Sequence, residues 1–182
     1  FYLAQTYLQY YLADVVRSFQ ALGRTLTEAP FQAVALLGLL ISLGAALASV
    51  PAGRASDRLG RKPLIYLSGA GLGLLMPFRL LFPRYDLLLA LALVFGLFYG
   101  VYLAVDWALV ADVLKDPEAH ATDMGLWQTA IVVPQVLAGA FGRPLDLLNA
   151  QTPGLGYQVL FLLAALFFLL GAFGVAGVRR SR

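Results

Sequence analysis

The stretch LLLALALVFGLFYGVYLAV, Leu87–Val105, runs for 19 residues without a charged or amide side chain. A helix of that length spans about 30 Å, the thickness of the hydrocarbon core of a bilayer. The whole chain has the same character: 60% of its 182 residues are hydrophobic and only 13% are charged. A soluble domain carries about twice that share of charge, which its surface needs. The sequence therefore predicts an all-α integral membrane protein.

Four other tracts indicate further crossings, and a sixth is more polar. Phe31–Gly53, Met124–Gly142 and Leu147–Val178 are uncharged, and Leu64–Phe82 carries only Arg79. The N-terminal tract Phe1–Leu22 includes glutamines and charges, so we expect it to cross with one side facing protein or water. We therefore expect a single bundle of six transmembrane helices over residues 1–182. Polar connections should lie at residues 23–30, 54–63, 83–86, 112–122 and 143–156.

The distribution of basic residues predicts how the bundle lies in the membrane. The second and fourth connections and the C-terminal tail hold eight Lys and Arg residues, and the opposite side holds three. Lys and Arg concentrate in cytoplasmic loops. We therefore expect the protein to lie in the cell membrane, with these two connections and both termini in the cytoplasm.

A short pattern occurs twice. Gly53-Arg54-x-x-Asp57 follows the second apolar tract, and Gly142-Arg143-x-x-Asp146 follows the fifth. The predicted topology places the two copies on opposite membrane faces. This is the arrangement expected of two inverted three-helix repeats, which would cover residues 1–82 and 87–178.

The first copy extends into a longer motif, Gly53-x-x-x-Asp57-Arg58-x-Gly60-Arg61-Lys62. It resembles the signature loop of the major facilitator superfamily, which joins the second and third helices of a six-helix half. The resemblance implies a gating role for these residues as a cytoplasmic latch between helices. The alternative is an ordinary basic cytoplasmic loop, although that would require neither the glycines nor the aspartate.

The resemblance covers the whole chain as one half of a transporter. Family members normally have twelve helices in two halves, and the start at Phe1 without Met makes this chain look like a C-terminal half. A second half, either another copy or a separate N-terminal half, is then an expected partner. Tyr99–Gly125 looks like the branch of sugar–cation symporters and sucrose-type carriers, in which the fourth helix carries an acid and a Trp. Asp106 and Trp107 are adjacent here, whereas the melibiose-type pattern separates them.

Asp106 is the foremost candidate for binding a substrate or an ion. A carboxylate inside a membrane is costly unless it pairs, takes up a proton or meets water. The alternative is a structural hydrogen bond near the cytoplasmic interface. Tyr99 and Tyr102 lie within about 60° of Asp106 around a helix and could stack on a ligand together with Trp107. Trp107 could instead anchor the helix at the interface.

Two other tracts carry polar groups that suit a neutral polyol. Gln128 and Gln135 share a face of the fifth tract, with Pro134 between them. In the first tract the polar side chains fall on about half of the helix circumference: Tyr2, Gln5, Thr6, Gln9, Tyr10, Asp14 and Arg17. The glutamines could instead join helices. Asp14 could form an inert ion pair with Arg17, or Arg17 could exchange partners during gating. Arg79 is expected to extend to the outer interface.

The composition argues against other functions. The chain has no Cys and one His, so thiolate chemistry, disulfides and a metal centre are not expected, nor is a cofactor. Basic residues are too scattered for nucleic-acid binding. With no nucleophile and base in evidence, we do not expect an enzyme. The leading hypothesis is a secondary active transporter, a symporter of a small polar solute such as a sugar, coupled to a proton or cation. The alternative is a membrane binding or assembly protein on the same bundle.

Overall fold

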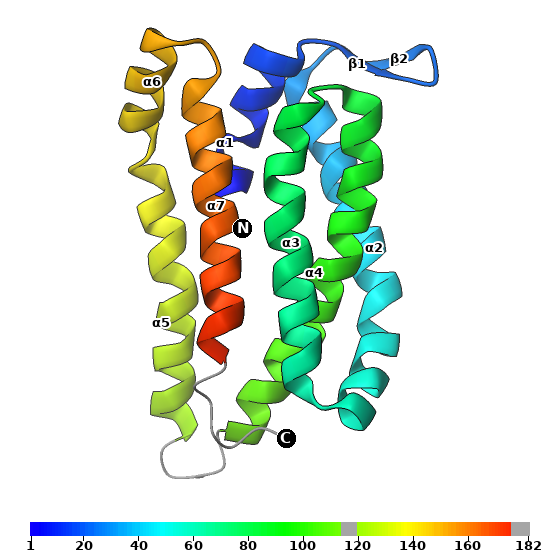
Figure 1. Ribbon diagram of the computed structural model, residues 1–182, viewed down its shortest axis with the longest axis vertical. Helices are drawn as coiled ribbons and strands as arrows, with labels where there is room; N and C mark the ends of the chain where they lie inside the picture. The colour runs from blue at the N-terminus through cyan, green and yellow to red at the C-terminus, as the bar shows by residue number, and fades with distance from the viewer. Residues whose placement is uncertain (114–119, 176–182) are drawn as a thin grey trace.

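The structure is a computed structural model that describes residues 1–113 and 120–175. In chain order the elements are α1 (Tyr2–Tyr11), η1, a π-helical turn (Leu12–Val16), β1 (Phe19–Ala21), β2 (Arg24–Thr27), α2 (Pro30–Leu59), α3 (Arg61–Leu81), α4 (Tyr85–Val113), α5 (His120–Gly139), α6 (Gly142–Gln151) and α7 (Leu155–Gly174). The long helices run side by side along the long axis of an elongated bundle (Figure 1). One end carries β1, β2 and α6 and is called the hairpin end. The other contains the α2–α3 joint.

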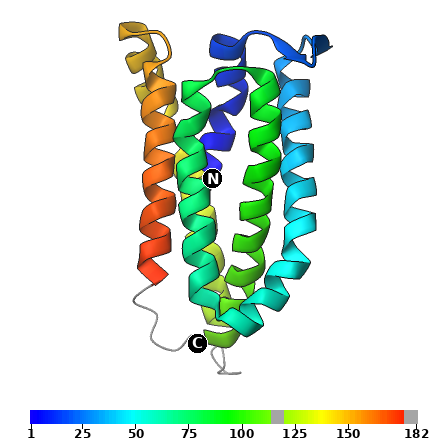
Figure 2. The ribbon, with the colours of Figure 1, turned by 45° about the vertical axis from the view of Figure 1, so that its right-hand side comes forward.

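The helices pack in a definite order. α2 lies along α4, α3 lies between α4 and α7, and α5 packs on α1. Figure 2 shows α2, α3 and α4 close together, with α7 beside α3. The main core is built from apolar residues of α1, α2, α3, α4 and α7. Within the described residues, α5 buries little, and Ala138 is the buried residue along its length.

Five helical segments in the described ranges are long and apolar enough to cross a membrane: α2, α3, α4 up to Val110, residues 121–151 across α5 and α6, and α7. These five segments correspond in length and composition to five of the six predicted crossings. The predicted N-terminal crossing over Phe1–Leu22 is wrong in extent, because its helix ends at Val16 and lies from mid-height to the hairpin end (Figure 1). That helix is too short to be counted with the five. The six-helix count and the repeats therefore stay predictions.

A β-hairpin replaces the end of the predicted first helix. Arg17 adopts a left-handed conformation with φ 60°, which stops the helix. Leu22 (φ 52°) and Gly23 (φ 76°) then form a two-residue turn, and positive φ at both positions suits a hairpin. Phe19 anchors the hairpin on α4, with its ring centroid 5.3 Å from that of Tyr85.

The predicted connection over residues 54–63 is also wrong. α2 continues through it to Leu59, and α3 begins at Arg61. Only Gly60 separates them, with φ 86° and ψ 160°, a region that glycine alone visits easily. The apolar tract ends near Gly53, but the backbone hydrogen bonds of a helix are internal, so the helix can extend past it into a polar environment.

The predicted connection over residues 143–156 is replaced by α6 and a short turn. α6 presents Leu145 to the interior, and its Asn149 side chain accepts a hydrogen bond from the Gly156 backbone N–H at 2.8 Å. Gly154, with φ 85°, then turns the chain into α7. The connection at 83–86 is confirmed in place, since α3 ends at Leu81 and α4 begins at Tyr85. The connection at 112–122 falls mainly on residues 114–119, outside the described residues.

Glycines bring α2 and α4 into direct backbone contact. A Cβ atom at Gly96 would lie 2.3 Å from the carbonyl oxygen of Ile41, and one at Gly100 would lie 2.4 Å from that of Ala45. Gly44 faces Leu93 in the same way, at 2.5 Å. Small residues let helices approach closely in membranes, where packing is a main source of association.

Gly96→Ala should lower the free energy of unfolding by about 1–3 kcal/mol, because its methyl group must push α2 away from α4. Gly38→Ala is the matched control, since a Cβ there meets nothing within 4 Å. It should be neutral or stabilising by about 0.5–1 kcal/mol, the gain of alanine over glycine in a helix. Thermal unfolding of both variants in detergent measures the difference. Equal stability of the two would contradict the tight contact.

Candidate functional site

A cavity of about 590 Å³ lies between α1, α4, α5 and α7, and is called here the α4–α5 cavity. Six of the nine predicted binding residues line it: Tyr99, Tyr102, Asp106, Trp107, Gln128 and Gln135. The wall is completed by Phe1, Tyr2, Leu103, Trp127, Ala130, Ile131, Pro134, Phe167 and Phe168. The fold thus brings together polar and aromatic groups from α4 and α5. These helices follow each other in the chain, but α4 packs mainly on α2 and α3, and α5 packs on α1.

Helical spacing explains how α4 supplies four of these residues. Tyr99, Tyr102 and Asp106 are three and seven residues apart, which places them on one face. Val105, next to Asp106 in the sequence, is fully buried in a small apolar cluster with Ile65 and Leu109. One side of α4 is therefore fixed in the protein interior, and the other presents its polar groups to the cavity.

Two tryptophans form part of the wall. The rings of Trp107 and Trp127 meet edge to face, with centroids 4.5 Å apart. Sequence reasoning missed Trp127. The available signal was its spacing from Ile131 and Gln135, four and eight residues on, which places all three on one helix face. Trp107 remains 53% exposed, so an aromatic surface is open beside Asp106.

Asp106 is half-buried and has no hydrogen-bond or ion-pair partner among residues 1–113 and 120–175. The structural hydrogen bond considered as its alternative role thus has no partner in the described part of the chain. An unpaired carboxylate in a membrane bundle is costly unless water, a proton or a cation compensates it. This supports a binding role, which stays a prediction.

The remaining three predicted residues lie elsewhere. Gln5 lines a separate cavity of about 190 Å³ between α1, α2, α3 and α4. Gln9 is exposed on α1 and is not among the residues that line the α4–α5 cavity. Asp14 lies at the hairpin end, beside a cavity of about 690 Å³ that also contacts Arg17 and Asn149. The structure therefore does not bring Gln9 or Asp14 to Asp106.

Asp14 pairs with α7 rather than with its neighbour. Its carboxylate accepts a hydrogen bond from the Tyr157 hydroxyl. The Arg17 Nε atom instead donates to the backbone oxygen of Asp14, at 2.8 Å. The expected side-chain pair between Asp14 and Arg17 is wrong, because the helix ends in a π-turn and Arg17 leaves helical geometry.

Arg79 also departs from expectation. It was expected to extend to the outer interface, but its guanidinium points into the bundle and lies 4.7 Å from the centroid of the Phe161 ring. The Tyr11 hydroxyl donates to the Arg79 carbonyl oxygen at 3.0 Å, which fixes the end of α3 against α1. The arginine thus turns toward an aromatic face inside the protein.

The residues of the predicted gating motif lie at the α2–α3 joint. Gly53, Asp57 and Arg58 are in the last turns of α2, Gly60 is the break, and Arg61 and Lys62 begin α3. Asp57 and Arg58 are exposed, whereas Ser56 is buried and donates to the Gly53 carbonyl oxygen at 2.8 Å. The motif is thus a tight helical elbow rather than an extended loop.

The long apolar helices define a multi-pass membrane protein, a mainly helical bundle with a polar, aromatic-lined cavity. The family model of the Major Facilitator Superfamily matches residues 1–181. The chain belongs to this superfamily of membrane transporters, as the motif after its second apolar tract indicated. Neither a curated protein nor a solved structure matches the chain.

Tyr157→Phe should destabilise the bundle by about 1–3 kcal/mol, because it leaves the Asp14 carboxylate without its hydrogen-bond donor. Tyr66→Phe is the matched control, since the Tyr66 hydroxyl has no hydrogen bond within the described ranges. Denaturant unfolding in detergent measures both changes. A Tyr157→Phe variant as stable as Tyr66→Phe would show that the α1–α7 link contributes nothing.

Proposed function

We propose that this chain is a secondary active transporter, or one half of one, that moves a small polar solute by alternating access. The observation that carries this proposal is the unpartnered Asp106 carboxylate in a cavity lined by aromatic and amide side chains. Membership of a transporter superfamily supports it. The solute site is proposed to be the α4–α5 cavity.

A sugar is the solute class that best suits this wall. Sugar rings present apolar faces that stack on aromatic rings, and Trp107 and Trp127 offer such surfaces side by side. Amides both donate and accept hydrogen bonds, as hydroxyl groups do. Gln128 and Gln135 therefore match a polyol in a way that a purely apolar wall would not. The sugar–cation symporter resemblance is in line with this choice.

Coupling to a proton or cation follows from the cost of the charge. With Asp106 ionised and the cavity closed from water, the carboxylate would lose its hydration without gaining a partner. A bound proton or cation removes that cost. The bundle is therefore proposed to reorient mainly when Asp106 is neutralised and the solute is bound, which links the two fluxes.

A second six-helix half is proposed as the partner, and this chain as the C-terminal half. The α4–α5 cavity is bordered on one side by α5, whose surface is little buried in the described structure. The helix contacts support inverted repeats over residues 1–82 and 87–178. In such repeats α1 corresponds to α4, α2 to α5 and α3 to α7. The α2–α4 contact then corresponds to the α5–α1 contact, and the α3–α7 contact corresponds to itself. All three contacts occur.

The α2–α3 joint is proposed to face the cytoplasm of the cell and to act as the gating element. Four basic residues gather there, Arg54, Arg58, Arg61 and Lys62, consistent with an anionic inner leaflet and the positive-inside rule. Gly60 permits the sharp change of direction between two rigid helices. The predicted cytoplasmic location of both termini belongs to the same proposal.

Asp106→Asn should abolish coupled uptake, lowering it at least about tenfold, because an amide has no charge to be neutralised by a proton or cation. The measurement is uptake of radiolabelled sugars into vesicles driven by a proton or sodium gradient. Vesicles carry the chain alone or together with a second six-helix half.

Asp86→Asn provides the matched control. Asp86 is also on α4, but it lies at the hairpin end and forms an exposed ion pair with Arg84 at 2.7 Å. This variant should retain uptake. Equal, gradient-driven uptake by Asp106→Asn and the unmodified chain would refute the coupling role. Absence of uptake by every pairing, with the chain well folded, would favour a binding or assembly protein instead.

A further inference from the structure

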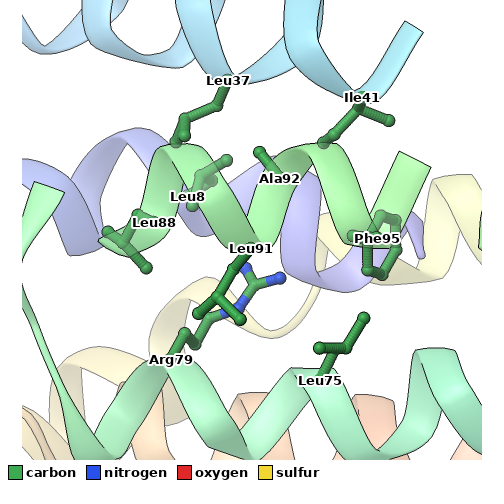
Figure 3. A pocket seen from close by; sticks show the side chains of 9 residues that line it. All are labelled: Leu8, Leu37, Ile41, Leu75, Arg79, Leu88, Leu91, Ala92 and Phe95. Carbon is green, nitrogen blue, oxygen red and sulfur yellow. The ribbon is translucent and has the colours of Figure 1, made fainter. Parts of the chain in front are cut away.

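A positive charge lies inside the bundle, apart from the α4–α5 cavity. Figure 3 shows the Arg79 side chain leaving α3 and pointing toward Leu91 of α4, in a cavity that Leu8 of α1 and Ala92 of α4 also line. Arg79 is partly buried and lines two adjoining cavities between α1, α2, α3 and α4. The arginine thus directs its charged end into the bundle, against the Phe161 ring, rather than toward the outer interface.

No carboxylate neutralises this charge within residues 1–113 and 120–175, and no backbone or side-chain acceptor receives a hydrogen bond from the guanidinium there. Its immediate surroundings are apolar: Leu8, Leu37, Ile41, Leu75, Leu88, Leu91, Ala92 and Phe95. The Phe161 ring offsets part of the cost by a cation–π contact. Because an arginine stays protonated in proteins, the remaining cost calls for an anion.

A cavity of about 190 Å³ adjoins the guanidinium and is called here the Arg79 pocket. Its lining includes three uncharged polar side chains, Gln5, Ser42 and Tyr99, and each of them can donate a hydrogen bond. No acidic residue of the described chain lines this pocket. A guanidinium beside three neutral donors in an otherwise apolar cavity is suited to a small anion that carries an apolar part.

We propose that the Arg79 pocket binds the carboxylate of a small organic anion. A guanidinium presents two parallel N–H donors that match the two oxygens of a carboxylate, and this match favours a carboxylate over a spherical anion. The apolar wall receives the short hydrocarbon part of the ligand. This site goes beyond the proposed function: it is distinct from the cavity of Asp106, with Tyr99 and Phe1 as shared wall residues.

Propionate is the probe, and its binding to the whole chain in lipid nanodiscs is measured by NMR in a buffer without other small anions. Propionamide, of the same shape but uncharged, and chloride are the comparison ligands. Arg79→Gln should weaken propionate binding at least about tenfold, and Arg79→Lys should weaken it less, since lysine keeps the charge but not the fork. Arg24→Gln, at an exposed arginine of β2, should leave binding unchanged.

Propionate affinity that is equal in Arg79→Gln and the unmodified chain would overturn the proposal. Propionamide or chloride binding as tightly as propionate would overturn its carboxylate assignment. Thermal unfolding provides an independent check. In anion-free buffer Arg79→Gln should unfold at a higher temperature than the unmodified chain, because it removes an uncompensated charge, and propionate should raise the unfolding temperature only when Arg79 is present. A lower unfolding temperature in anion-free buffer would show that the arginine is already compensated.

Discussion

The cost of a charge in a bundle surrounded by lipid is the constraint on which this structure depends. Most of the chain avoids it, with apolar tracts long enough to cross a bilayer and the basic residues gathered near the helix ends. Three charged side chains of the described residues lie inside or beside the bundle, and their surroundings differ. Asp14 accepts a hydrogen bond from Tyr157, Arg79 faces the ring of Phe161, and Asp106 faces a cavity without a protein partner. Asp106 and Arg79 have no protein partner of opposite charge in the described residues, so each remains available to a ligand or an ion.

The position of Asp106 depends in turn on how α4 is held. The glycines of α2 and α4 bring the two backbones together along much of their length, so α4 cannot rotate without separating them. Val105 and Leu109 bury the side of α4 that faces α3. Tyr99, Tyr102 and Asp106 lie on the side of α4 away from these glycines and line the cavity shared with α5. Close packing at one face of the helix therefore determines which groups are offered at the other.

Much of this could be predicted from the sequence, because hydrocarbon thickness and helical periodicity act on local patterns. Five crossings, the shared face of Tyr99, Tyr102 and Asp106, and the superfamily all follow from such patterns. The ends of helices were predicted less well. Polar residues 54–59 looked like a connection, but a helix that has left the lipid can continue in a polar environment, and only Gly60 ends it.

Long-range placement could not be predicted, since it depends on packing between distant segments. Asp14 pairs with a tyrosine 143 residues away rather than with nearby Arg17. Arg79 lies in the last turn of α3, where snorkelling was the simple expectation, yet an aromatic ring on α7 offers it an interior position. Gln5 and Gln9 share a helix face with other polar groups, but the spacing on one helix does not predict which other helices that face contacts.

The paired indoles have a practical consequence. The chain contains two tryptophans, and both lie in the wall of one cavity, in contact with each other. The near-ultraviolet emission of this protein under indole-selective excitation therefore originates from a single place. Any solute that enters beside Asp106 alters the polarity around that chromophore pair, so occupancy of the cavity is readable optically without attaching a dye.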